Sequence, residues 1–152
     1  MTEITVDDSV REGYDAVRDD SREENWCVFG YADDVNGGDP NTIVFQSSGS
    51  GGYDEFAATL AAWDGKRGYG FLRQTSGDEL SARAKFVFVS WVPDNTPIRK
   101  RAAVSTHKGF VKDVVKDFAI ELHATDMDDM SLEEIQKGLK KAGGANYGSS
   151  SS

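Results

Sequence analysis

The chain has 152 residues, a formal net charge of −9 and a pI near 4.6, so one acidic domain with a core of its own is expected. Its one cysteine, Cys27, excludes an intrachain disulfide and a cysteine metal cluster. The acidic first nine residues and the lack of any apolar run near about 20 residues predict no signal peptide, no membrane insertion and a cytoplasmic location.

The first half of the chain alternates predicted helices and strands. Two apolar strands flank a predicted loop over 32–41, which contains Asn36-Gly37-Gly38-Asp39-Pro40, so we expect the strands to pair as a hairpin. The segment 47–52 is predicted to be a linker, because it lacks the Gly-Lys-Ser/Thr ending of a phosphate-binding loop. The predicted elements are a helix over 7–20, strands over 25–31 and 42–45, a helix over 53–63 and a strand over 68–73.

The stretch 83–92 organises the second half. It carries aromatic and β-branched residues in both alternation phases, which is typical of a strand buried on both faces. Thr96 is predicted to cap a long helix that begins at Pro97 and reaches Lys116. Apolar residues of this helix fall on two stripes that are out of phase, which predicts a kink or a change of burial near Gly109.

Two further elements complete the predicted domain. Residues 118–123 alternate as a fifth strand, and Ser131 opens a capping box for a last helix that Gly143-Gly144 should end. The order predicts a mixed α/β fold, with a five-stranded mixed sheet flanked by about four helices on both faces. We expect one domain over 1–147 and a flexible serine-rich tail over 148–152.

The long helix carries cations at an unfavourable end. Arg99, Lys100 and Arg101 fall in its first turn, where the helix dipole is positive and each exposed cation is unfavourable by roughly 0.3–1 kcal/mol. Because these cations lower the stability of the helix, their presence indicates that a binding partner outside the domain requires them. The same face of the helix continues as a polar stripe formed by Arg101, Ser105, Lys108 and Lys112.

The charge distribution indicates what kind of partner this is. Residues 81–116 include eight basic and two acidic residues, a net of +6, whereas the remainder of the chain carries −15. Nucleic-acid-binding domains are usually basic overall, so an acidic protein surface is the better prediction and nucleic acid is not expected.

The sequence offers little catalytic or metal-binding chemistry. His107 and His123 have no second ligand at metal-binding spacing. The acidic run 126–129 fails as a calcium loop, since Ser131 and Lys137 stand where glycine and glutamate are required. We therefore predict a non-enzymatic protein that uses no cofactor and no metal.

Several segments together resemble one family. They are Thr75-Ser76-Gly77-Asp78, the Lys-Phe-x-x-x-x-Trp strand within 83–92, the helix from Pro97, and Lys140-Lys141-Ala142-Gly143-Gly144-Ala145-Asn146-Tyr147. They resemble the coactosins, single-domain members of the actin-depolymerising factor homology superfamily, over nearly the whole chain. The resemblance implies that fold and a monomer that binds the side of filamentous actin, binds monomeric actin weakly or not at all, associates with the cytoskeleton and affects filament capping and dynamics.

The resemblance also implies two contact surfaces. The first, on the long helix, comprises Arg99, Lys100, Arg101, Ser105, Thr106, Lys108 and Lys112. The second comprises Arg83 and Lys85 near the sheet edge and Lys137, Lys140 and Lys141 on the last helix. Two alternatives stay open: a cofilin-like depolymerising or severing protein, and a phosphoinositide-binding module. Thr2 does not match the regulatory serine of depolymerising factors, and Pro93 replaces a glycine more usual in coactosins.

Overall fold

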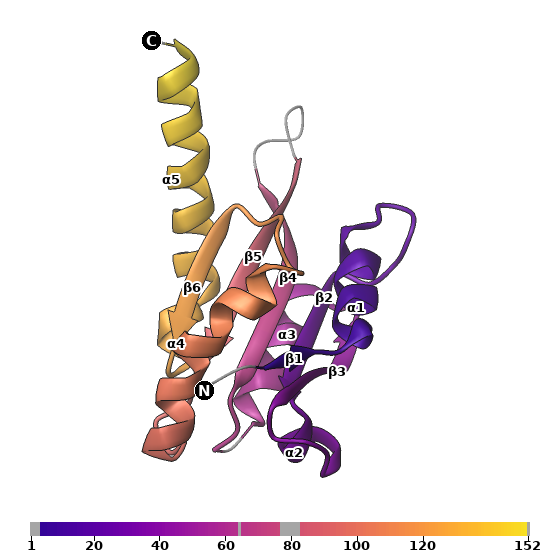
Figure 1. The fold of residues 1–152 in the computed structure, drawn as a ribbon. Coiled ribbons are helices and arrows are strands. Elements are labelled where there is room, and N and C mark those ends of the chain that lie inside the picture. Colours follow the sequence, from indigo (N-terminus) through magenta and orange to yellow (C-terminus); the bar gives the residue numbers. More distant parts are fainter. Residues whose placement is uncertain (1–3, 64, 77–82, 152) are drawn as a thin grey trace.

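A computed structural model describes residues 4–63, 65–76 and 83–151, without the side chains of Ser76, Arg83 and 144–151. Figure 1 shows one sheet with helices packed on both of its faces. The elements are β1 (Thr5–Val6), α1 (Asp8–Arg18), β2 (Trp26–Tyr31), α2 (Ala32–Asn36), β3 (Thr42–Gly49), α3 (Gly52–Ala61), β4 (Gly68–Ser76), β5 (Arg83–Trp91), α4 (Ile98–Lys112), β6 (Ile120–Ala124), the 3-10 helix η1 (Met127–Met130) and α5 (Leu132–Ser151).

The sheet is mixed, as predicted, with the strand order β1-β3-β2-β4-β5-β6. The outermost pairs, β1 with β3 and β5 with β6, are parallel, and the inner pairs are antiparallel. The sheet has six strands instead of the predicted five, because the two residues of β1 pair with Thr42 and Ile43. A strand of two residues is too short to show an alternating pattern, so periodicity could not reveal it.

The predicted hairpin is confirmed, but its connection is more ordered than expected. β2 and β3 pair antiparallel with an irregularity between Val28 and Phe29, and the short helix α2 occupies the start of the predicted loop. This helix ends at Gly37, whose φ of 76° lies in the left-handed region that glycine adopts without strain. With α2, the described residues contain five α-helices in place of about four.

The Ser/Gly segment 47–52 is only partly a linker. Residues up to Gly49 belong to β3, and the helix α3 begins at Gly52. The Glu55 carboxylate accepts hydrogen bonds from the Gly51 amide at 3.0 Å and from Trp26 Nε1 at 2.8 Å. A carboxylate of the chain itself therefore occupies the N-terminus of α3, where a phosphate would bind in a phosphate-binding loop.

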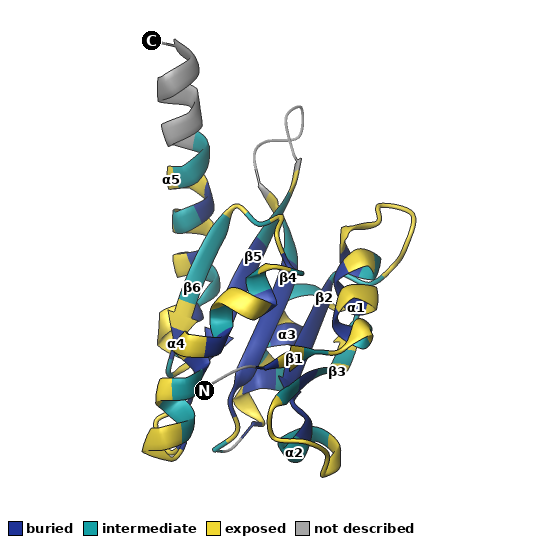
Figure 2. Cartoon of the chain, in the orientation of Figure 1, coloured by how far each residue is buried: buried dark blue, intermediate teal, exposed yellow. Residues whose placement is uncertain are grey.

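Two apolar clusters hold the helices on the sheet, and Figure 2 shows the buried strands between them. All six residues of β2 are buried, and the predicted burial of the central part of β5 is confirmed. Helices α1 and α4 cover one face of the sheet, with buried residues that include Val10, Val104 and Val111. Helices α3 and α5 cover the other face, with buried residues that include Phe56 and Ile135.

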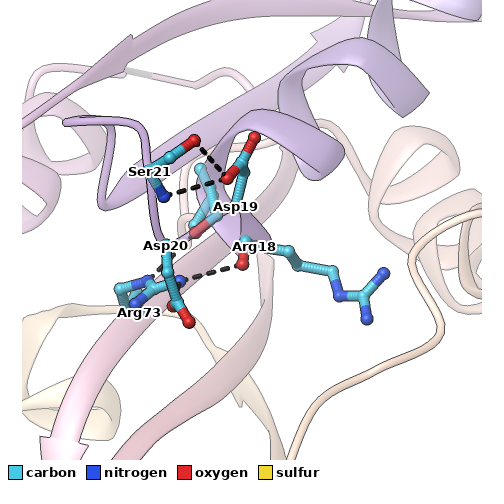
Figure 3. A network of polar contacts seen from close by, with 6 residues as sticks. Arg18, Asp19, Asp20, Ser21 and Arg73 are labelled. Carbon is cyan, nitrogen blue, oxygen red and sulfur yellow. Dashed lines mark hydrogen bonds and ion pairs between the residues drawn. The ribbon is translucent and has the colours of Figure 1, made fainter.

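Arg73 fastens the C-terminal end of α1 to the sheet (Figure 3). From β4 it donates hydrogen bonds to the carbonyls of Val17 and Arg18, at 3.1 and 2.9 Å, and reaches Asp20 at 2.6 Å. Arg18 points away from Arg73 and pairs with Asp117 at 2.6 Å. Because Asp117 follows α4 in the chain, α1 also fixes the position of that helix's C-terminal end.

The last helix begins as predicted but continues beyond its predicted end. The Ser131 hydroxyl accepts the Glu134 amide at 3.1 Å, as a capping residue should. Gly143 does not stop α5, because a glycine ends a helix by adopting positive φ, and the described residues that do so are Gly37, Gly52 and Gly65. The predicted tail, 148–152, lies outside the residues whose side chains are described. No helix in the described part of the chain is both long and apolar enough to cross a membrane.

The packing of α3 can be tested at Gly70. A Cβ atom there would lie 2.6 Å from two ring atoms of Phe56, so we expect Gly70→Ala to lower the free energy of unfolding by about 1–3 kcal/mol. Gly109→Ala is the matched control, since nothing lies within 4 Å of its Cβ position and helix propensity should raise stability by up to about 1 kcal/mol. Urea unfolding measures both, and a wild-type value for Gly70→Ala would contradict this packing.

Candidate functional site

The helix α4 begins directly after a tight turn. The Thr96 amide donates to the Pro93 carbonyl at 2.9 Å, and Pro97 follows with extended dihedral angles, φ −54° and ψ 142°. Pro97 is therefore the N-cap and Ile98 the first helical residue. The prediction that Thr96 caps the helix is wrong, since its hydroxyl is buried and has no hydrogen-bond partner in the described part of the chain.

One side of α4 packs on the sheet through three buried residues, Val104, His107 and Val111. Their spacing of three and four residues forms a single stripe. The stripe continues past Gly109, so the predicted change of burial there is wrong. The opposite face stays exposed along the helix and is formed by Ile98, Ala102, Ser105 and Gly109.

Two of the predicted cations have no internal counter-charge. Arg99 is exposed and Arg101 half-exposed, and neither forms an ion pair with any carboxylate among the described residues. They lie in the first turn of α4, which contains no acidic residue. The positive end of the helix dipole therefore adds to their charge. Ser105 and Thr106 are exposed one turn further along.

The three lysines of the same predicted surface are paired instead. Lys100 lies 3.9 Å from Asp33 and 3.8 Å from Asp34, both on α2. Lys108 and Lys112 share Glu121 on β6, at 2.8 and 2.7 Å. Burial raises the pKa of Glu121, but the hydrogen bonds from both lysines outweigh it and lower that pKa overall. The protein itself thus compensates most of this charge.

Helix α4 also carries exposed apolar residues that the prediction of site residues missed. Ile98 is 75% exposed and Phe110 40% exposed, and they are the large exposed hydrophobic side chains of the described residues. The sequence contained a signal that Ile98 is exposed, because its position around the helix lies off the stripe formed by Val104 and Val111. Sequence periodicity alone did not say which stripe faces the sheet.

A buried polar cluster supports the first half of α4 from below. Tyr31 contacts His107 Nδ1 at 2.8 Å, and the Tyr69 hydroxyl donates to the Val104 carbonyl at 2.8 Å. The Arg67 guanidinium lies 3.5 Å from the centroid of the Tyr31 ring and donates to the Lys100 carbonyl at 2.8 Å. Arg67 and His107 thereby help to fix the orientation of the turn that carries Arg99.

This environment disfavours a second positive charge. Burial, and then the nearby Arg67 cation, lower the pKa of His107 below its usual value. Burial also raises the pKa of Tyr31 and of Tyr69, so both remain phenols. The neutral imidazole can accept a hydrogen bond from the Tyr31 hydroxyl at Nδ1, which is the arrangement that the cluster favours.

The second predicted surface lies on another part of the molecule. Lys137, Lys140 and Lys141 are exposed on α5, which packs on the sheet face opposite α4. Figure 1 shows α4 and α5 on either side of the β6 edge. Lys85 is half-buried on β5, and the side chain of Arg83 lies outside the described residues. The predicted residues therefore form two groups, one on each sheet face.

The His107 environment predicts a pH dependence of stability. The unfolded chain, with a histidine pKa of about 6.5, binds the proton more tightly than the folded chain does. The free energy of unfolding should therefore be highest above that pH and fall as the pH drops toward the lower folded pKa. Denaturant unfolding across this range, with wild type and His107→Asn, tests this, because asparagine keeps an acceptor but does not titrate.

The matched control for that prediction is His123→Asn, which removes the exposed histidine of β6. It should retain the wild-type loss of stability on acidification, whereas His107→Asn should flatten it. An unchanged pH profile in His107→Asn would show that His107 does not cause the effect.

Comparison with known proteins identifies the kind of chain that carries this surface. Residues 3–140 match the family described as cofilin/tropomyosin-type actin-binding protein. Coactosin from Dictyostelium discoideum is 39% identical over 138 residues, which cover 91% of this chain and 90% of the relative.

Solved structures agree with the family match. The crystal structure of coactosin from Entamoeba histolytica superposes with a TM-score of 0.82 at 35% identity, covering 93% of this chain and 98% of the other. The solution structure of mouse coactosin, an actin filament binding protein, gives a TM-score of 0.73 at 35% identity with 100% of both chains covered. The predicted resemblance and fold are therefore confirmed, with the strand count corrected to six.

Proposed function

Because this chain belongs to the coactosins within the cofilin/tropomyosin-type family of actin-binding proteins, we propose that it is a non-enzymatic protein that binds the side of actin filaments. The observation that carries the proposal is that Arg99 and Arg101, beside the exposed Ile98 at the first turn of α4, form no ion pair with any described residue. Association with the cytoskeleton follows from the actin link; a cytoplasmic location and effects on capping and filament dynamics belong to the proposal.

Local energetics support an external acidic partner for this turn. Two cations at the positive end of a helix are each unfavourable by roughly 0.3–1 kcal/mol without a counter-charge. The chain has 26 acidic residues, and it pairs Lys100, Lys108 and Lys112 with some of them, but leaves Arg99 and Arg101 unpaired among the described residues. An acidic partner surface that binds this turn would offset the unfavourable interaction of the two arginines with the helix dipole. Ile98 would bury apolar area in the same contact.

The position of the second group of lysines favours filaments over monomers. Lys137, Lys140 and Lys141 project from a helix on the sheet face opposite α4, and both helices lie near the β6 edge. One actin subunit would meet the α4 surface, and a neighbouring subunit would meet α5. Only a polymer offers both contacts together, so we propose weak or no binding to monomeric actin by a monomeric protein.

The paired lysines argue against a polyanion as the main ligand. Binding of a phosphoinositide headgroup or nucleic acid gains chiefly from many free cations. In this surface, Lys108 and Lys112 are held by Glu121, and Lys100 lies beside two aspartates. A phosphoinositide-binding role is therefore weaker than the filament-binding role.

Charge reversal tests the α4 contact. We expect Arg99→Glu with Arg101→Glu to weaken co-sedimentation with filaments at least roughly tenfold, or about 1.4 kcal/mol, because the partner's carboxylates would then repel the turn. Wild-type binding should fall with salt, since exposed charges are screened over about 10 Å at 0.1 M. Arg11→Glu, an exposed site on α1, is the matched control and should bind normally. Full binding by the double variant would remove α4 from the proposal.

Filament preference is tested by measuring filaments and monomers side by side. The wild type should bind filaments at least roughly tenfold more tightly than monomers, a difference of about 1.4 kcal/mol. Lys137→Glu with Lys141→Glu should reduce filament binding and leave stability unchanged, because both side chains are exposed. Tight monomer binding together with faster filament disassembly would instead identify a cofilin-like depolymerising or severing protein.

A further inference from the structure

The loop between α1 and β2, residues 19–25, belongs to neither of the two basic surfaces. Its segment 19–24 contains four acidic residues and one basic residue, a net charge of −3. Residues 19–23 are exposed, and a hollow of about 500 Å³ separates residues 21–24 from residues 48–50. Neither apolar cluster includes a residue of this loop, so another protein can reach the loop without disturbing the core.

The loop contains a serine with carboxylates at a recognisable spacing. Among the serines whose side chains are described, three precede a glutamate by three positions, namely Ser9, Ser21 and Ser131. Acid-directed protein kinases select this spacing, because cationic groups in their substrate groove attract the carboxylates that follow the serine. The sequence alone does not distinguish the three serines.

The fold separates Ser21 from the other two serines. Ser9 and Ser131 are half-buried at the starts of helices, and their hydroxyls accept backbone amides from Phe45 at 3.0 Å and Glu134 at 3.1 Å. Ser21 is exposed and lies outside any helix or strand, and its hydroxyl donates to the Asp19 carboxylate at 2.7 Å. A kinase can therefore draw out the loop around Ser21 without breaking a helix cap or a contact of the sheet.

The same serine also follows an arginine by three positions, which is a spacing that basic-directed kinases recognise. That arginine, Arg18, is the last residue of α1 and pairs with Asp117 at 2.6 Å. Figure 3 shows its side chain directed away from Ser21. Glu23 and Glu24, by contrast, follow Ser21 within the loop itself, so the structure favours recognition through the carboxylates.

We propose that Ser21 is a phosphorylation site for an acid-directed serine kinase. In this step the Ser21 oxygen forms a bond to the γ-phosphorus of ATP, and the bond from that phosphorus to the β–γ bridging oxygen breaks. ADP leaves, and the hydroxyl proton passes to the catalytic carboxylate of the kinase. The proposal does not depend on filament binding.

Phosphorylation at Ser21 would act on the attachment of α1. The phosphate adds a charge of about −1.5 to −2 beside Asp19 and Asp20, at the helix end where the dipole is already negative. It also removes the hydroxyl that donates to Asp19. Arg73 holds this end through the carbonyls of Val17 and Arg18 and through Asp20, so it has no free side chain to offer the phosphate (Figure 3).

Kinase treatment of the full chain tests the site. The folded protein is incubated with a purified acid-directed serine kinase and magnesium ATP, and the modified positions are mapped by mass spectrometry. We expect phosphate on Ser21 and none on Ser9 or Ser131. The phosphorylated protein should unfold at a temperature lower by roughly 2–4 °C, because the added charge weakens the end of α1.

Charge reversal tests how the kinase recognises the loop. Glu23→Lys with Glu24→Lys should lower the initial rate of modification at Ser21 at least roughly tenfold, because the cationic groove would then be repelled. Glu12→Lys, at an exposed site on α1, is the matched control and should be modified as fast as the wild type.

Each part of the proposal can be overturned separately. Modification of Ser9 or Ser131 in preference to Ser21, or of none of the three, would remove the site. A basic-directed kinase that modifies Ser21 faster than the acid-directed enzyme, or a wild-type rate in the double variant, would overturn the class of kinase. An unchanged unfolding temperature of the phosphorylated protein would overturn the effect on α1.

Discussion

The seating of α4 on the sheet decides which side chains of this protein a partner can reach. Val104, His107 and Val111 face inward, so the opposite side of the helix must face outward over its full length. The buried contacts of Tyr31 and Arg67 with this helix, and the attachment of Asp117 to α1, then leave it little freedom to rotate or slide. The exposed side of α4 is therefore held in place by packing on the sheet.

Ion pairing divides the basic residues of the helix into two kinds. Lys100, Lys108 and Lys112 lie at the flanks, where neighbouring elements supply Asp33, Asp34 and Glu121. Arg99 and Arg101 lie where the described part of the fold provides no carboxylate, and arginine is the better residue for bidentate recognition of an acidic surface. A count of basic residues in the sequence does not distinguish these five side chains. The positions of the carboxylates in the fold separate the three lysines, which form ion pairs within the protein, from the two arginines, which are available for binding.

The sheet separates two groups of exposed basic residues. One accompanies α4, and the other accompanies α5 on the opposite face, and the β6 edge lies between them. An edge that presents cations on both sides is suited to a partner that also has two surfaces in a fixed relation, which is a property of a polymer.

The sequence by itself determined the mixed α/β class, the order of the main elements, the strand at the centre of the second half and the helix that carries the cations. These features depend on local periodicity and capping, which neighbouring residues encode. It could not reveal β1, which exists only because two residues pair with β3, or the continuation of α5 past Gly143. Only the tertiary structure decided that Lys100, Lys108 and Lys112 are paired while Arg99 and Arg101 have no ion pair with the described residues. Carboxylates from α2 and β6 reach the lysines across gaps of up to 67 residues in the chain, which local sequence patterns do not encode.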